Sequence, residues 1–149
     1  MIIINTPLET VYDSFMQKTT DYKLLELSQD DYYAECLQLL KGALARFVLA
    51  EDMTIDSTLN EFNRELTLLE IDILSLGMVI HWVSPKVNSI ELMKMSLGSR
   101  DYQMYSQANH IKELLEMKNE ANREFSYWIT QYSSKKALEE LKKRWVITR

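Results

Sequence analysis

The sequence contains very little glycine, proline or cysteine. Its 149 residues include three Gly, two Pro and a single Cys, Cys36. β-Sandwiches and barrels need many tight turns, which glycine and proline supply, so their scarcity favours long helices. One cysteine excludes an internal disulfide and a multi-cysteine metal site. We therefore predict an all-α protein in which Cys36 is a small apolar residue on a helix.

The sequence also lacks long uncharged stretches. A membrane span requires roughly 18 such residues, and the longest uncharged run, Ile73 to Pro85, is shorter. The apolar start, Met1 to Asn5, has neither the basic leader nor the long apolar region of a secretory signal. We expect synthesis in the cytoplasm and no membrane contact.

Signatures of catalysis are missing as well. The three glycines lie too far apart for a phosphate-binding loop, and no nucleophile motif is present. His110 has Glu113 at the i+3 position, but a metal site needs further ligands from other elements. His81 lies in an apolar stretch, where a histidine satisfied by one hydrogen bond is the ordinary case. We predict no enzymatic activity, no metal and no cofactor.

The best-defined element is an apolar helix from Thr67 to Ser84. Thr67 and Glu70 have capping-box spacing, in which each side chain accepts a hydrogen bond from the other residue's backbone amide. Pro85 is expected to end the helix, because a residue before proline avoids helical backbone angles. Apolar residues lie nearly all the way round, which indicates a central buried helix.

Two capped helices are predicted before this central one. The first spans Pro7 to Lys18, with Thr6 as N-cap and proline at the first helical position. The second begins at Ser28, which has Asp31 at cap spacing. The apolar residues of the second helix form a stripe at steps of three and four: Tyr33, Leu37, Leu40, Leu44 and Phe47.

The C-terminal half is predicted to contain one short helix and one long helix. The short helix covers residues 90–97 and ends at Gly98; a loop over residues 99–105 follows. The long helix is capped by Ser106 and runs to about Tyr132, and Ser133-Ser134 interrupts it before a last helical piece ending near Trp145. Its expected inner face consists of Ala108, Ile111, Leu115, Asn122, Phe125, Ile129 and Tyr132.

Together these elements predict a compact bundle of about four to five helices with a long C-terminal helix. One short extended segment is expected near residues 53–60, where apolar and polar residues alternate weakly. We divide the chain into a helical domain, residues 1–132, and a basic C-terminal arm, residues 133–149.

Charge is distributed unevenly along the chain. The whole chain carries −5, whereas the segment from Lys135 onward carries +4, which leaves −9 on the remainder. The acidic total argues against broad nucleic-acid binding. A basic end on an acidic body suggests docking on an acidic surface or a polyanion. The alternative is a solvated helix end whose cations complement the helix dipole.

Aromatic residues exceed what one small core needs, and such residues are enriched at protein interfaces. The alternative is partial packing against neighbouring helices. We predict that partner binding involves two tyrosines of the loop and the basic end. The candidate residues are Tyr102, Tyr105, Lys135, Lys136, Lys142, Lys143, Arg144, Trp145 and Arg149.

Two stretches carry a family resemblance. They are Phe62…Leu66-Thr67…Glu70-Ile71…Ile73-Leu74…Met78…Trp82…Pro85-Lys86-Val87-Asn88-Ser89 and Leu97-Gly98-Ser99-Arg100-Asp101-Tyr102…Tyr105-Ser106-Gln107-Ala108-Asn109-His110. Over about residues 28 to 132 the chain resembles head–tail connector (neck adaptor) proteins of tailed bacteriophages that infect Gram-positive bacteria.

The resemblance implies a mostly helical subunit of a homo-oligomeric ring in the virion neck. Such rings dock on the portal protein, contact other neck or tail proteins and extend the DNA channel, so DNA is channel content without sequence-specific contacts. The subunit would be made in the cytoplasm of the host bacterium.

Three other functions are kept as alternatives. The first is a soluble helical adaptor or regulatory module that binds a single protein partner in a groove beside Gly42 and Ala43. The second is a DNA-binding helical domain that uses residues 135–149. The third is an enzyme that uses His110 and Glu113, for which the sequence gives no positive support.

Overall fold

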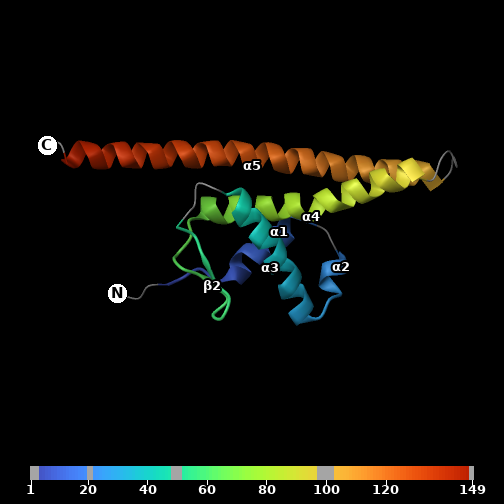
Figure 1. The fold of residues 1–149 in the computed structure, drawn as a ribbon, viewed down its shortest axis with the longest axis horizontal. Coiled ribbons are helices and arrows are strands. Elements are labelled where there is room, and N and C mark those ends of the chain that lie inside the picture. Colours follow the sequence, from blue (N-terminus) through green and yellow to red (C-terminus); the bar gives the residue numbers. More distant parts are fainter. Residues whose placement is uncertain (1–3, 20–21, 48–51, 97–102, 148–149) are drawn as a thin grey trace.

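The computed structural model describes residues 4–19, 22–47, 52–96 and 103–147 (Figure 1). Within these ranges the chain is mostly helical, which confirms the predicted all-α bundle with a long C-terminal helix. The helices are α1 (Leu8–Lys18), α2 (Tyr22–Leu25), α3 (Gln29–Arg46), α4 (Leu68–Ser96) and α5 (Gln103–Ile147). The strands are β1 (Ile55–Asp56) and β2 (Glu61–Phe62).

Helix α4 is the centre of the fold. Helix α5 runs back along one side of it, whereas α1 and α3 pack on the other side (Figure 1). The core lies where these helices meet and includes fully buried Phe15, Leu40, Ile73 and Met78. One stretch of α4, Leu68–Ser89, is long and apolar enough to cross a membrane by length and composition alone, and 56% of it is buried inside the protein. Burial by three neighbouring helices accounts for this apolar character.

The predicted capping box opens α4 as expected. The Glu70 amide donates to Thr67 Oγ1 at 3.2 Å, and the Thr67 amide donates to Glu70 Oε1 at 3.0 Å. The predicted end of this helix is wrong, however, because α4 continues through Pro85 to Ser96. The predicted separate helix over residues 90–97 is therefore the last part of α4, and Gly98 lies outside the described residues.

Tertiary packing explains why α4 continues through its proline. Proline removes one backbone hydrogen bond and crowds the carbonyl four residues earlier, which disfavours a helix interior. Here Val83 and Val87 are both buried, two residues to either side of Pro85, in a cluster with Leu114 of α5. The helix must remain continuous to place both valines against α5.

Helix α5 is one uninterrupted helix of 45 residues. The predicted cap at Ser106 and the predicted interruption at Ser133-Ser134 are both wrong, because these serines lie inside the helix. Serine is only mildly unfavourable within a helix, so two of them do not end one that is already formed. The predicted inner face is displaced by one position near its start: Leu114 is buried, whereas Leu115 is 38% exposed.

The segment before α1 is joined to the small sheet. The predicted Thr6 cap is wrong: α1 begins at Leu8 with Pro7 as its N-cap and no side-chain cap bond. Instead, Thr6 Oγ1 accepts a hydrogen bond from the Leu66 amide at 2.8 Å, and its carbonyl accepts from the Phe62 amide at 2.9 Å. Strands β1 and β2 pair antiparallel, which confirms the predicted extended segment.

Candidate protein-docking arm and its anchor

Helix α5 carries every predicted partner-binding residue that the structure describes. Tyr105 lies in its first turn and Trp145 in its last, 40 residues apart, so about 60 Å of helix separates them. Tyr102, Arg149 and the side chain of Tyr105 lie outside the described part of the protein. The predicted residues therefore belong to two ends of one helix and do not form a single site.

The C-terminal part of α5 extends beyond the body of the protein (Figure 1). We call residues 133–147 the arm; its side chains are exposed from Ser133 to Val146. Large apolar side chains on the arm include Leu138 (59% exposed), Leu141 (52%) and Trp145 (67%). Their spacing of three and four residues places them on one helical face, which we call the apolar stripe.

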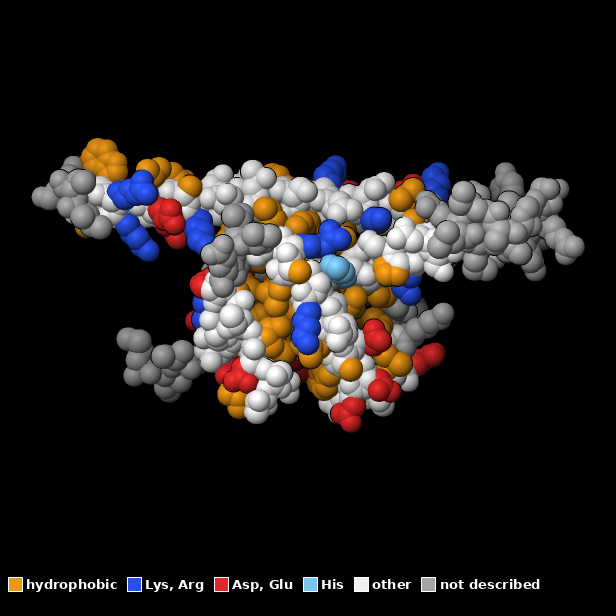
Figure 2. All heavy atoms as spheres, viewed as in Figure 1, with side chains coloured by type: hydrophobic (Ala, Val, Ile, Leu, Met, Phe, Trp, Pro, Cys, Tyr) orange, Lys and Arg blue, Asp and Glu red, His pale blue; other side chains and the backbone are white. Residues whose placement is uncertain are grey.

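Cations border the apolar stripe. At 100° per residue, Lys135 and Lys142 lie on one flank and Arg144 lies on the other, whereas Lys136 and Lys143 lie on the far face. In Figure 2 hydrophobic, basic and acidic side chains are all exposed on the arm. An apolar stripe between cations is suited to a protein surface with an apolar groove and an acidic rim.

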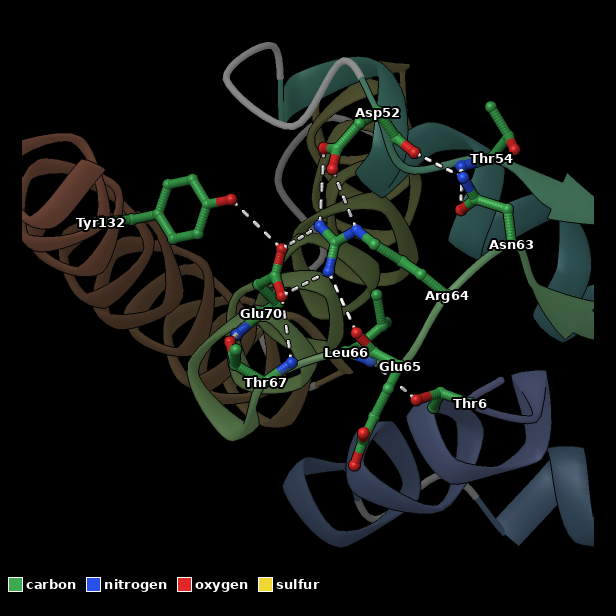
Figure 3. A network of polar contacts seen from close by, with 10 residues as sticks. All are labelled: Thr6, Asp52, Thr54, Asn63, Arg64, Glu65, Leu66, Thr67, Glu70 and Tyr132. Carbon is green, nitrogen blue, oxygen red and sulfur yellow. Dashed lines mark hydrogen bonds and ion pairs between the residues drawn. The ribbon is translucent and has the colours of Figure 1, made fainter. Parts of the chain in front are cut away.

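A buried polar network attaches α5 to the body just before the arm (Figure 3). Glu70 is 2% exposed and forms an ion pair with the guanidinium of Arg64. Arg64 Nη1 donates to Glu70 Oε1 at 2.9 Å, and its Nε lies 3.1 Å from the Asp52 carboxylate. The Tyr132 hydroxyl points from α5 toward Glu70 and donates to its Oε2 at 3.1 Å. This network fixes the position at which the arm leaves the body.

The network holds Glu70 in its charged form. Burial alone raises the pKa of a carboxyl group, but here the hydrogen bonds from Arg64, the Thr67 amide and Tyr132 outweigh it and lower the pKa of Glu70 to about 2. Burial, and then the neighbouring Glu70 carboxylate, raise the pKa of Tyr132 to about 12, so its hydroxyl keeps the proton it donates.

Replacing Tyr132 with Phe tests this attachment. The substitution removes one hydrogen bond to a charged acceptor and is expected to lower the free energy of unfolding by about 1.5 kcal/mol. Tyr127 is 55% exposed, so Tyr127→Phe is the matched control and should change stability by less than about 0.5 kcal/mol. Urea unfolding followed by circular dichroism measures both; equal effects of the two substitutions would contradict the proposed attachment.

Two other candidate groups have structural roles. His81 Nε2 accepts from Arg46 Nε at 3.0 Å where α3 meets α4, and the ring also forms a hydrogen bond with the Gly42 backbone, so this histidine is satisfied by hydrogen bonds as predicted, with two in place of one. Cys36 is fully buried, as predicted, and burial raises its pKa to about 11. His110 is exposed, and no group of three or more metal-binding side chains occurs among the described residues.

The groove predicted beside Gly42 and Ala43 does not exist, because α4 fills that space. An added Cβ at Gly42 would lie 2.7 Å from the His81 ring, and one at Gly77 would lie 2.8 Å from the Ala43 Cβ. The small side chains at these positions let α3 and α4 of the same chain approach each other closely.

The sequence reasoning missed a groove between α1, α3 and the β1–β2 turn. It has a volume of about 400 Å³. We call it the α1–α3 groove; its lining includes Leu8, Tyr12, Tyr33, Ala34, Leu37 and Leu59. These residues come from three segments far apart in sequence, so no local pattern predicted it. The one local signal was Leu59, an apolar residue within a turn.

In comparisons with protein-family models, curated proteins and solved structures, no match to this chain was found. Functional inference therefore rests on the residues and geometry of the chain itself.

Proposed function

We propose that this protein is a structural subunit of a tailed-phage virion: a ring-forming head–tail connector that docks on the portal and joins the capsid to the tail around the DNA channel. The observation that carries the proposal is the arm, which continues α5 beyond the body and exposes Leu138, Leu141 and Trp145 on one face. An exposed apolar face of this kind is typical of an interaction surface, and a subunit of an assembly has a partner to cover it.

The long α4–α5 hairpin supports the same role. It places the two predicted contact regions far apart, with the arm at one end of α5 and the first turn of α5, which contains Tyr105, at the other. A ring subunit that joins neighbours as well as the portal needs separate surfaces of this kind. The network around Glu70 holds the arm at a fixed point, which reduces the ordering cost of binding.

Substituting the apolar stripe tests this function. A variant with Leu138→Ser, Leu141→Ser and Trp145→Ser is expected to fold and to lose association with the portal protein encoded by the same genome, with affinity falling at least about 100-fold. Because the stripe is exposed, the free energy of unfolding of this variant should change by less than about 0.5 kcal/mol per substituted residue. Co-sedimentation of the full chain with portal assemblies measures the loss.

The control carries three serines on the far face of the same arm: Glu139→Ser, Glu140→Ser and Lys143→Ser. These positions are exposed and lie away from the stripe. The control variant should bind the portal protein with the same affinity as the native chain. Full binding by the stripe variant, or a native chain that does not bind the portal at all, would contradict the proposal. A fixed one-to-one complex would instead favour the single-partner adaptor.

A further inference from the structure

We infer that the arm of one subunit docks in the α1–α3 groove of a second copy of this chain. This inference rests on the proposed function, because it names the partner surface that joins neighbouring subunits of the ring. Three observations carry it: the apolar side chains that line part of the groove, the opposite charges of the two surfaces, and the direction in which the arm leaves the body.

The groove offers the apolar surface that the stripe requires. Leu59 on the rim is 64% exposed and Leu37 is half-buried, whereas Leu8 and Tyr12 are buried and close the floor. The β1–β2 turn holds Leu59 in that place: Asp56 Oδ1 accepts from the Thr58 and Leu59 amides at 2.9 and 3.2 Å. A groove of about 400 Å³ has room for an indole ring.

The charges of the two surfaces are complementary. Residues 8–37, which form α1, α2 and the first half of α3, include seven acidic and two basic residues and thus carry −5. The segment from Lys135 onward carries +4. In Figure 2 acidic side chains gather along the edge of the body farthest from α5. Glu9 lies on the groove itself, where its Oε1 accepts from the Tyr33 hydroxyl at 3.4 Å, and it can pair with a cation that flanks the stripe.

The arm cannot reach the groove of its own chain. Helix α5 packs on one side of α4, whereas α1 and the groove lie on the other side, and the arm leads away from the body (Figure 1). Two different patches are therefore joined, one on each copy. Such heterologous contacts repeat from subunit to subunit and close into a ring when the rotation allows it.

Disulfide trapping tests the pairing in the full-length protein. One chain carries Ala34→Cys in the groove, and a second chain, of different mass, carries Val146→Cys on the flank of the stripe that Lys135 and Lys142 form. The native Cys36 is fully buried and so provides no competing thiol. Mild oxidation of the mixture is expected to give the mixed disulfide at about tenfold the yield obtained when the second chain carries Glu140→Cys, on the far face of the arm.

Charge exchange provides a second, matched test. Lys142→Glu reverses a cation on the flank of the stripe and should lower the mixed-disulfide yield by about tenfold. Lys143→Glu makes the same change on the far face and should leave the yield within about twofold. Combining Lys142→Glu in one chain with Glu9→Lys in the other should restore most of the yield.

The outcomes separate this inference from the proposed function. A preferred Ala34–Val146 disulfide that follows the charge exchange supports the inference. Preferred pairing of Val146→Cys chains with one another would show that arms pair with arms, and absence of any disulfide between chains would show that they do not meet; either result overturns it. If the chain assembles on the portal while no Ala34–Val146 disulfide forms, the inference is wrong and the connector function is retained.

Discussion

Replacing Glu70 with Gln is expected to lower the free energy of unfolding by about 3 kcal/mol. Glu70 is 2% exposed and its carboxylate receives hydrogen bonds from Arg64, the Thr67 amide and Tyr132. Gln cannot accept at both terminal atoms and leaves the guanidinium without its main counter-charge. This loss lies at the lower end of the range found when buried ion pairs are broken. The Arg64 side chain is 29% exposed, so water can partly solvate its charge after the substitution.

Glu70→Gln should also change how the stability of the protein depends on pH. The pKa of Glu70 is lowered from its ordinary value of 4.5 to about 2 in the folded protein. A carboxyl group with a lowered pKa contributes stability above about pH 4.5, and this contribution is lost as the pH falls toward 2. Urea unfolding of the native protein and of Glu70→Gln should therefore show a difference in the free energy of unfolding. This difference should be constant near pH 7 and should shrink between pH 4.5 and 2.

Glu65→Gln is the control, since Glu65 is exposed and five residues away on the same segment. It should change the free energy of unfolding by less than about 0.5 kcal/mol. A Glu70→Gln protein as stable as the control at pH 7 would show that the network does not hold α5 to the body.

The second large effect is expected at the close contact between α3 and α4. Gly77→Ala places a Cβ 2.8 Å from the Ala43 Cβ and 3.1 Å from its Cα. The Ala43 atoms belong to the packed helix, so the two helices must separate. We expect a loss of about 2 kcal/mol from this overpacking, even after the gain of about 1 kcal/mol in helix propensity.

Gly42→Ala is the informative comparison on the facing helix. Its added Cβ would lie 2.7 Å from three atoms of the His81 ring, which is a side chain near the surface that can rotate away. The net cost should stay below about 1 kcal/mol, because the gain of about 1 kcal/mol in helix propensity offsets part of the loss of the hydrogen bonds to Arg46 and to the Gly42 backbone. Thermal and urea unfolding measure both variants; a Gly77→Ala protein at least as stable as the native one would contradict the close packing of α3 on α4.

Local signals predicted the starts of α3 and α4, which begin with a capping pair, but the predicted caps at Thr6 and Ser106 are wrong. The hydroxyl of Ser28 accepts from the Asp31 amide at 3.3 Å, as its spacing indicated, and the capping box at Thr67 is complete. Each depends on residues three apart, so the sequence contains the whole interaction. The ends of elements were predicted poorly: Pro85 and Ser133-Ser134 were expected to break helices, but contacts with distant residues hold α4 through its proline, and serine alone does not interrupt α5.

In the candidate site, too, local features were predicted and features that depend on distant contacts were not. The basic, apolar arm is a continuous segment, so its charge and spacing were visible in the sequence. The network that positions it joins Arg64, Glu70 and Tyr132, which lie up to 68 residues apart, and the α1–α3 groove combines three separate segments. Contacts of this kind appear only when the chain has folded. The resemblance to phage connectors concerns spacing and stays a prediction about function.

The central claim is that this chain is a ring subunit on a portal. Electron microscopy of the full-length protein mixed with the portal protein encoded by the same genome tests it most directly. The proposed function predicts a closed ring of many copies seated on the portal, with its channel continuing the portal channel. A protein that stays monomeric and leaves the portal unoccupied would contradict it.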